Sequence, residues 1–240
     1  MLLQNFIKKL LNKLSRVIYH LTPSEFKNEL NLHEHYKKEQ QLNSYNFFKK
    51  YFKKSILFKN SLEIRKYSID RATQKKEQNL CYLEFGVFNG TSINFFSNFV
   101  HEIYGFDSFE GLNEDWIGNL GFSKGHFDLK NKLPKVNANV NLIQGKVQDT
   151  LDNFIEAKII LNNLKINFIH MDLDTYESSL FVLKKIKPYL VKNSIILFDQ
   201  LHNFEGWDTG ELKALNEVFD DNEYNYIAFS MEHQAAILIN

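Results

Sequence analysis

The sequence is poor in cysteine and proline and carries no net charge. Its 240 residues include one cysteine, Cys81, and three prolines, and 29 Lys and Arg residues balance 29 Asp and Glu residues. A single cysteine excludes an internal disulfide, and Cys81 lies in an apolar run where it is expected to pack as a small hydrophobic residue. Balanced charge removes the general attraction of a basic protein to nucleic acid. We therefore expect no nucleic-acid partner.

Long apolar runs are also missing. A helix that spans a bilayer needs about 20 consecutive apolar residues, and no apolar run in the sequence comes close to that length. The apolar start of the chain is interrupted by Lys8, Lys9, Lys13 and Arg16, so a cleaved signal peptide is not expected. The hydrophobic fraction of 44% and charged fraction of 24% are those of a globular protein with ample core material. We expect a cytoplasmic protein.

Charge is distributed unevenly along the chain. Residues 1–60 hold 12 Lys and Arg residues against 4 Asp and Glu residues, and residues 61–240 hold 17 against 25. Such asymmetry suggests two parts with different roles. We interpret residues 1–60 as a basic helical extension and residues 61–240 as one catalytic domain.

The extension opens with an amphipathic helix over residues 2–19. Its apolar residues recur at helical spacing and its basic residues occupy the other face. One interpretation is packing on the body of the protein or on a second subunit in a homodimer. The other is peripheral contact of residues 1–20 with a membrane, because basic amphipathic helices lie well on anionic lipid. Residues 24–60 are predicted to form helices with a loop that covers part of the active-site mouth.

The central motif is the stretch from Leu80 to Ser92. Residues 80–85 form a predicted buried strand, Gly86 and Gly90 interrupt the pattern, and a helical apolar stripe follows. Strand, glycine turn and helix form the ligand-binding opening of a doubly wound α/β domain. Thr91 and Ser92 are N-cap candidates and candidate cofactor contacts.

The glycine spacing in this motif differs from that of dinucleotide enzymes. The pattern is acid-x-Gly-x-x-x-Gly, not Gly-x-Gly-x-x-Gly. The acid at the strand end, Glu84, suits a ligand with a positive charge, such as the ammonium of S-adenosylmethionine. An ordinary strand-to-helix turn is the alternative.

The next two strands add further cofactor candidates. Asp107 ends the second strand, with Ser108 beside it, and can accept hydrogen bonds from two ribose hydroxyls. Gln148 and Asp149 follow the third strand, predicted at 140–147, where an adenine ring would lie. Asp149 could instead cap the next helix.

The remaining elements complete an α/β pattern. Residues 109–138 form a long loop, and such loops are often functional lids. Five alternating β/α units and a closing hairpin predict a Rossmann-like, doubly wound, seven-stranded sheet. The other predicted elements are helices at 61–78, 176–187 and 206–220, and strands beginning at 166, 193, 224 and 234.

Acids also end the fourth and fifth strands. Asp172 and Asp174 follow a buried strand, and side chains two apart on a strand point the same way, so both face the cleft if extension persists. Asp199 ends the fifth strand and is followed by Gln200 and His202. Ligands of such sheets bind at the carboxyl ends of the strands, so these acids are candidate site residues.

Three motifs together resemble a known family. Tyr-Leu-Glu-Phe-Gly-Val-Phe-Asn-Gly-Thr-Ser, Tyr-Gly-Phe-Asp-Ser-Phe-Glu-Gly-Leu and Met-Asp-Leu-Asp-Thr-Tyr-Glu-Ser-Ser resemble the macrocin-O-methyltransferase-like family of TylF, MycF and NovP type. The resemblance covers about residues 60–240. It implies a class I fold, S-adenosylmethionine as cofactor, Mg²⁺ as a further cofactor, and the hydroxyl of a sugar or glycosylated small molecule as acceptor.

The resemblance also implies roles for the acids. Asp172 and Asp199 would bind the metal, and Asp172 would also lie beside the cofactor. Asp174 would be the general base. The family has a second acid where this chain has Gln200, whose carbonyl can bind Mg²⁺ with one negative charge fewer. His202 is a substitute base or a packed histidine.

Three other functions stay open at the level of sequence. The first is a metal-independent methyltransferase on a small molecule, and the second is a non-catalytic protein that keeps the cofactor fold. A nicotinamide dehydrogenase is the third, which the glycine spacing disfavours.

Overall fold

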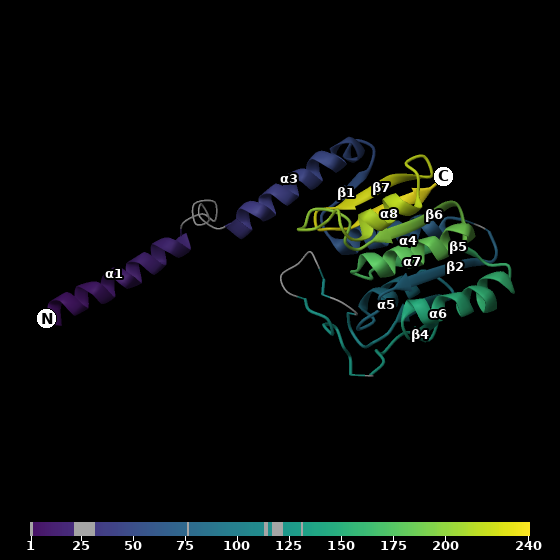
Figure 1. Ribbon diagram of the computed structural model, residues 1–240, viewed down its shortest axis with the longest axis horizontal. Helices are drawn as coiled ribbons and strands as arrows, with labels where there is room; N and C mark the ends of the chain where they lie inside the picture. The colour runs from purple at the N-terminus through teal and green to yellow at the C-terminus, as the bar shows by residue number, and fades with distance from the viewer. Residues whose placement is uncertain (1, 22–31, 76, 113–114, 117–121, 131) are drawn as a thin grey trace. The chain divides into compact units, whose positions relative to one another are not determined.

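The computed structural model describes residues 2–21, 32–75, 77–112, 115–116, 122–130 and 132–240 (Figure 1). By its internal contacts the chain divides into two compact units, Met1–Glu39 and Gln40–Asn240. Of the segment 24–60, which is predicted to form helices with a loop, residues 24–31 lie outside the described residues. Part of the predicted lid loop, at 113–114, 117–121 and 131, also lies outside them.

The first unit contains helix α1, Leu2–Leu21, which confirms the predicted amphipathic helix. Its apolar side chains are largely exposed, with Leu10 at 50% and Leu14 at 53%. Within the described part of the chain, no helix combines the length and the hydropathy needed to cross a membrane.

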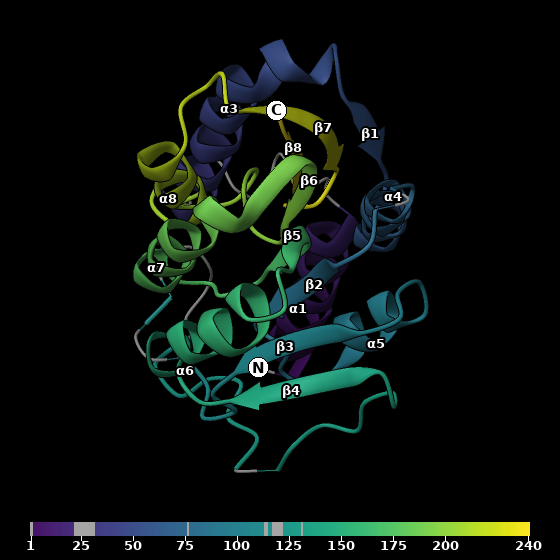
Figure 2. The ribbon, with the colours of Figure 1, turned by 90° about the vertical axis from the view of Figure 1, so that its right-hand side faces the viewer.

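The larger unit is built on one mixed sheet. Its strand order is β1-β7-β8-β6-β5-β2-β3-β4 (Figure 2). Strands β2 to β6 run parallel to one another, and β8 is antiparallel to both β6 and β7. The strands are β1 (Ile56–Phe58), β2 (Leu80–Phe85), β3 (Ile103–Asp107), β4 (Val140–Gln144), β5 (Lys165–Met171), β6 (Leu190–Phe198), β7 (Tyr224–Ser230) and β8 (Ala235–Ile239).

The α/β class and doubly wound order are confirmed, but the strand number is wrong. The described sheet has eight strands where seven were predicted. The additional strand, β1, pairs in parallel with β7 through Ile56 and Ala228. Its three residues are too few to show an alternating pattern, so the sequence could not reveal it.

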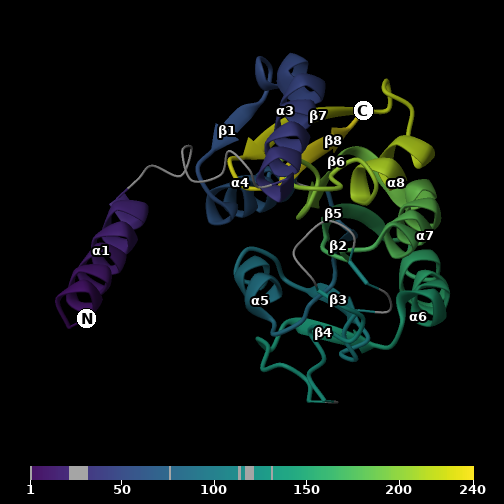
Figure 3. The same ribbon diagram turned by 60° about the vertical axis from the view of Figure 1, so that its left-hand side comes forward.

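Helices cover both faces of the sheet (Figures 2 and 3). One face carries α6, α7 and α8, and the other carries α4 and α5. Side chains of β6 alternate between the two buried clusters, since Ile196 and Phe198 belong to one and Ile195 and Leu197 to the other. The helices are α4 (Ser61–Thr73), α5 (Thr91–Ser97), α6 (Val147–Phe154) continued by a π-helix (Ile155–Ile160), α7 (Tyr176–Ile186) continued by a 3₁₀ turn (Lys187–Tyr189), and α8 (Glu211–Val218).

Helix α3, Leu32–Phe52, continues into the larger unit from Gln40 onward. Phe48 is fully buried there, with its ring 5.7 Å from that of Trp207 and 5.5 Å from that of Phe229. The Oγ of Ser44 accepts a hydrogen bond from the backbone N–H of Asn203 at 2.9 Å. Residues 40–52 therefore pack on the segment that follows β6.

Three predicted element boundaries are wrong by a few residues. The third strand ends at Gln144 because Gly145 adopts φ +131°, and Val147 already belongs to α6. Helix α4 ends at Thr73, before residue 78. The N-cap of α5 is Gly90, with φ +81°, and not Thr91 or Ser92.

Candidate active site

Four strand ends meet at one edge of the sheet. The backbone N–H of Asp172 donates to Phe85 O at 2.8 Å, and that of Asp199 donates to Met171 O at 2.9 Å. On the other side of β2, the N–H of Gly86 donates to Phe106 O at 2.9 Å. These bonds place the carboxyl ends of β2, β3, β5 and β6 next to one another.

A cavity of about 300 Å³ lies at this edge. It brings together eight of the predicted site residues, which come from five separate segments of the chain. They are Gly86, Asp107, Ser108, Gln148, Asp172, Asp174, Asp199 and Gln200. The lid loop contributes Gly111, Leu112 and Phe127 to the wall. The prediction that acids from several strand ends share one site is therefore supported for Asp107, Asp172, Asp174 and Asp199.

The glycine turn after β2 permits close approach of the backbone. Gly86 has φ +88°, and a Cβ built on it would lie 1.7 Å from the backbone oxygen of Asp172. A side chain at this position would fill the cavity edge and displace the end of β5.

Asp107 holds the glycine turn in shape. Its Oδ2 accepts hydrogen bonds from the backbone N–H groups of Val87 and Phe88, each at 2.8 Å. Its Oδ1 accepts one from the N–H of Phe109 at 2.7 Å. Carboxylate oxygens accept more than one hydrogen bond, so Asp107 keeps acceptor capacity on the cavity side.

Glu84 does not line the cavity, contrary to its predicted contact with the cofactor. The side chain is fully buried, and its Oε1 accepts a hydrogen bond from Ser92 Oγ at 2.7 Å. Its Oε2 lies 3.4 Å from His170 Nδ1. Glu84 and Ser92 thus link β2 to α5.

Two other predicted cofactor contacts, Gly90 and Thr91, support the turn instead of lining the cavity. Gly90 caps α5. The backbone N–H and the Oγ1 of Thr91 both donate to Asn89 Oδ1, at 3.0 and 2.7 Å.

Asp174 lies in the cavity wall, but it belongs to the segment after β5 and not to an extended strand. Strand β5 ends at Met171, and Asp174 has φ +60°, so the extended backbone assumed in the prediction does not persist. Loss of solvation, then the charges of Asp199 and Asp107, raise the pKa of Asp174 to about 7. Loss of solvation and the charge of Asp199 also raise the pKa of Asp172 well above its ordinary value.

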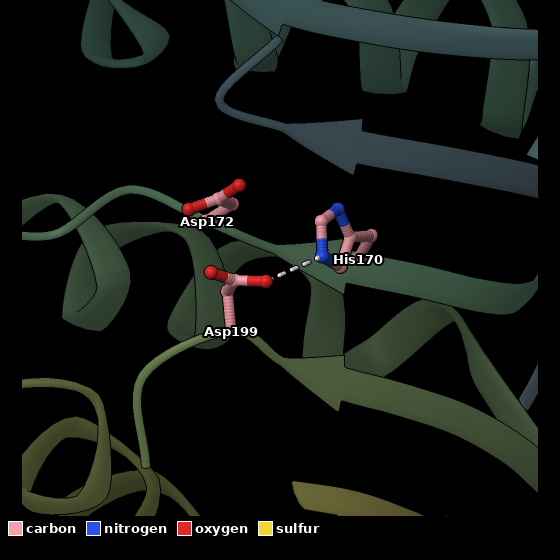
Figure 4. A group of neighbouring side chains, drawn as sticks. All are labelled: His170, Asp172 and Asp199. Atoms are coloured by element: carbon pink, nitrogen blue, oxygen red, sulfur yellow. Dashed lines mark ion pairs between the residues drawn. The ribbon is translucent and has the colours of Figure 1, made fainter. Parts of the chain in front are cut away.

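Asp199 is surrounded by donors from the protein. Oδ1 accepts a hydrogen bond from Arg65 Nη2 at 2.9 Å and another from Gln234 Nε2, and His170 Nε2 lies 3.4 Å from the same oxygen (Figure 4). Oδ2 accepts from Gln200 Nε2 at 3.2 Å. Burial alone would raise the pKa of Asp199, but the hydrogen bond and charge of His170 and the charge of Arg65 outweigh it and hold it below its usual range.

His170 is fully buried between two acids, Glu84 and Asp199. Burial opposes the charged ring, but the hydrogen bonds to Asp199 and Glu84 outweigh that effect and raise the pKa of His170 to about 9. In Figure 4 its ring and the carboxylates of Asp172 and Asp199 form one group at the ends of β5 and β6.

Besides Glu84, Gly90, Thr91 and Ser92, two further predicted site residues lie outside the cavity wall. His202 packs between the rings of Phe48 and Phe229, and its Nε2 lies 3.1 Å from Gln234 O. Burial lowers the pKa of His202 to about 4, and its place between two rings and outside the cavity wall favours the packed histidine of the two predicted alternatives. Asp149 is exposed on α6, a helix whose N-terminus has no side-chain cap bond.

Several polar residues at this edge were not predicted from the sequence. Arg65 comes from α4, and Gln234 comes from the segment before β8. Glu211 is buried at the start of α8 and accepts the N–H of Gln200 at 3.1 Å. Only His170 had a visible signal, as a polar residue in an otherwise apolar predicted strand.

Comparisons with known proteins agree with this geometry. The family described as methyltransferase domain matches residues 83–201, which include the end of β2, the glycine turn and the acids up to Asp199. No curated protein matches the chain.

Solved structures show the same fold. CalS11, a calicheamicin methyltransferase, is 20% identical with a TM-score of 0.59, over 90% of this chain and 93% of its own. The O-methyltransferase NovP is 16% identical with a TM-score of 0.51, over 75% of this chain and 79% of its own. The larger unit therefore has the class I fold, residues 83–201 match a methyltransferase domain, and the protein is an enzyme of the methyltransferase type.

Proposed function

We propose that the protein is an S-adenosylmethionine-dependent O-methyltransferase. Its acceptor is a hydroxyl of a sugar or of a glycosylated small molecule. The observation that carries the proposal is a single cavity whose wall holds Gly86, Asp107 and Asp174. One cavity is therefore lined by a glycine that lets a ligand approach the backbone, a carboxylate that can accept hydrogen bonds from the cofactor ribose, and a base.

The cavity suits the cofactor in three respects. Gly86 leaves its edge free of a side chain. Three backbone N–H groups occupy most of the acceptor sites of Asp107, which leaves capacity for a ribose hydroxyl, and Gln148 lines the wall with an amide that can bond an adenine edge. Asp172, which lies against Gly86, offers a carboxylate to the ammonium in place of Glu84.

Asp174 is the proposed general base. Bound S-adenosylmethionine would supply an electrophilic methyl group on its sulfonium. Asp174 takes the proton of the acceptor hydroxyl as that oxygen forms its bond to the methyl carbon, so the products are a methyl ether, S-adenosylhomocysteine and a protonated Asp174. A base is most effective when its pKa lies near the working pH, and a pKa of about 7 meets that condition.

The residues do not fit the magnesium ion that the family resemblance implies. Both oxygens of Asp199 already accept hydrogen bonds from protein donors, and one of these donors is the Arg65 guanidinium. Gln200 brings no charge, and its amide nitrogen points to Asp199. Mg²⁺ prefers a nearly octahedral set of free oxygen ligands. We therefore assign no step of the reaction to a metal.

The acceptor class is inferred from the structural neighbours. A second structure of CalS11, described as a TDP-rhamnose 3′-O-methyltransferase, is 21% identical with a TM-score of 0.53, over 74% of this chain and 77% of its own. A cavity with several carboxylates in its wall suits a polyhydroxylated acceptor, because a carboxylate can accept hydrogen bonds from sugar hydroxyls.

The experiment for this proposal is incubation with methyl-labelled S-adenosylmethionine and a panel of nucleotide sugars and glycosylated small molecules. Mass spectrometry should find a label on a sugar oxygen. Binding of S-adenosylhomocysteine without transfer to any hydroxyl compound would contradict the acceptor class.

We also propose that α1 contacts an anionic membrane surface. Residues 1–24 contain no Asp or Glu, and Lys9, Lys13 and Arg16 are exposed on the helix that exposes Leu10 and Leu14. An apolar face flanked by cations matches the interface of a bilayer that contains anionic lipid. Association of two copies through the same face is the alternative outcome of the test given below.

A further inference from the structure

We propose that Arg65 is a fixed internal cation that orients Asp199 at the cavity edge, in the role that a divalent metal ion would otherwise fill. This positioning role rests on the proposed methyl transfer for its functional meaning. The claim that no divalent ion binds at Asp199 can be tested without any activity.

The first argument is the arrangement of donors around Asp199. The Arg65 guanidinium reaches it from α4, 134 positions earlier in the chain, with a Nη2–Oδ1 distance of 2.9 Å. Gln234 donates from the segment before β8, and that residue is 2% exposed. The carboxylate is therefore held both from α4 and from the segment before β8.

The second argument is charge. At this edge Asp172 and Asp199 are acidic and Gln200 is neutral, while the Arg65 guanidinium and the His170 ring both lie within ion-pair distance of Asp199, at 2.9 and 3.4 Å. A guanidinium is charged at all physiological pH values. A divalent ion placed on Asp199 would meet Arg65 as a close like charge and would have to displace its hydrogen bond.

The third argument is that Gln200 matches this arrangement. Its amide nitrogen donates to Asp199 Oδ2 at 3.2 Å, which a carboxylate at the same position could not do. Its backbone N–H donates to Glu211, which is 2% exposed. Gln200 and Arg65 therefore both donate hydrogen bonds to Asp199, whose two carboxylate oxygens find their partners within the protein.

Holding Asp199 in place also affects the proposed base, Asp174. Asp199 carries one of the charges that act on Asp174. A fixed partner for Asp199 therefore also fixes the surroundings of the base, which is how Arg65 affects the reaction without touching substrate.

The direct test is titration of the chelator-treated full-length protein with Mn²⁺, followed by electron paramagnetic resonance. We expect no saturable binding by the wild type at this edge below about 1 mM, a weak site by the standards of protein oxygen ligands. The double variant Arg65→Gln/Gln200→Asp should gain a site at least about tenfold tighter. Arg65→Lys with Gln200→Asp keeps the positive charge and should gain much less.

Matched controls separate charge from position. Arg71→Gln removes the same charge from an exposed position on the same helix, and combined with Gln200→Asp it should not create the site. Thermal melts establish which variants fold. If the Arg65→Gln double variant does not fold, the wild-type titration and the Arg65→Lys variant still decide the question.

Three results would overturn the inference. The first is saturable Mn²⁺ binding by the wild type that Asp199→Asn abolishes. The second is a folded Arg65→Gln/Gln200→Asp variant that binds no better than wild type, and the third is an equal gain in the Arg71 control. Failure to find any methyl transfer would contradict the proposed function and would leave these titrations readable.

Discussion

Gly86 and the backbone carbonyl of Asp172 lie so close that no side chain fits between them. A Cβ on Gly86 would stand 1.7 Å from Asp172 O. This contact joins the glycine turn to the segment that carries the proposed base. A change in the turn after β2 would therefore also shift the segment that carries Asp174.

Gly86→Ala should therefore destabilise the fold and the site together. We expect a loss of about 2–4 kcal/mol in the free energy of unfolding, from the positive φ and the clash, and weak binding of S-adenosylhomocysteine. Gly125→Ala is the matched control, since Gly125 has φ +83° and no atom of the described residues lies within 4 Å of its added Cβ. It should cost only the φ component, about 1 kcal/mol. Equal losses in both variants, measured by denaturant unfolding, would refute the role of the contact.

Asp107→Asn should weaken cofactor binding. The amide keeps the size but offers one acceptor oxygen where the carboxylate offers two, so at least one backbone N–H in or beside the glycine turn loses its partner, at about 1–3 kcal/mol. We expect the affinity for S-adenosylhomocysteine, measured by calorimetry, to fall at least about tenfold. Ser108→Ala, a neighbour in the same wall, should have a smaller effect. An unchanged affinity in the Asp107 variant would remove Asp107 from the cofactor site.

The rate of methyl transfer should rise with pH through about 7. The pKa of Asp174 is raised to about 7, so below that value the carboxyl is protonated and cannot accept the acceptor's proton. Above it the rate should reach a plateau. The measurement is kcat at saturating cofactor and acceptor from pH 5.5 to 9. A rate that is flat between about pH 6 and 8 would show that Asp174 is not the group that titrates.

The full-length protein should sediment with vesicles that contain anionic lipid and not with purely zwitterionic ones. Lys13→Gln should weaken this binding by about 1 kcal/mol, roughly fivefold, and added salt should weaken it further. Leu10→Gln/Leu14→Gln should abolish it, because the apolar face supplies the insertion energy. Lys192→Gln, at an exposed position of the larger unit, serves as the charge control. No sedimentation, together with a mass that rises with protein concentration, would indicate self-association instead.

Much of the fold follows from local pattern. The strand 80–85 has the predicted bounds because it is a short apolar run closed by Gly86, and the acids that end β3, β5 and β6 meet because parallel strands end at one edge. Helix α1 follows from its apolar period. These features depend on residues that are close in sequence.

The rest of the site depends on contacts between distant residues. Nothing in the sequence of α4 marks Arg65 as the partner of Asp199. Glu84 was predicted to contact the cofactor because it lies near the end of a strand. In the structure it is buried, accepts a hydrogen bond from Ser92 and lies beside His170. Asp174 lies in the cavity wall with a positive φ, a backbone conformation that the hydrophobic periodicity of the sequence does not predict.

The most direct test of the proposed reaction is turnover of Asp174→Asn beside wild type at saturating S-adenosylmethionine, with S-adenosylhomocysteine affinity measured on the same samples. The exposed Asp149→Asn is the control. We expect turnover to fall by about 10²–10⁴-fold in Asp174→Asn, with nearly unchanged affinity and a normal Asp149 variant. Wild-type turnover in Asp174→Asn would contradict the assignment of Asp174 as the base.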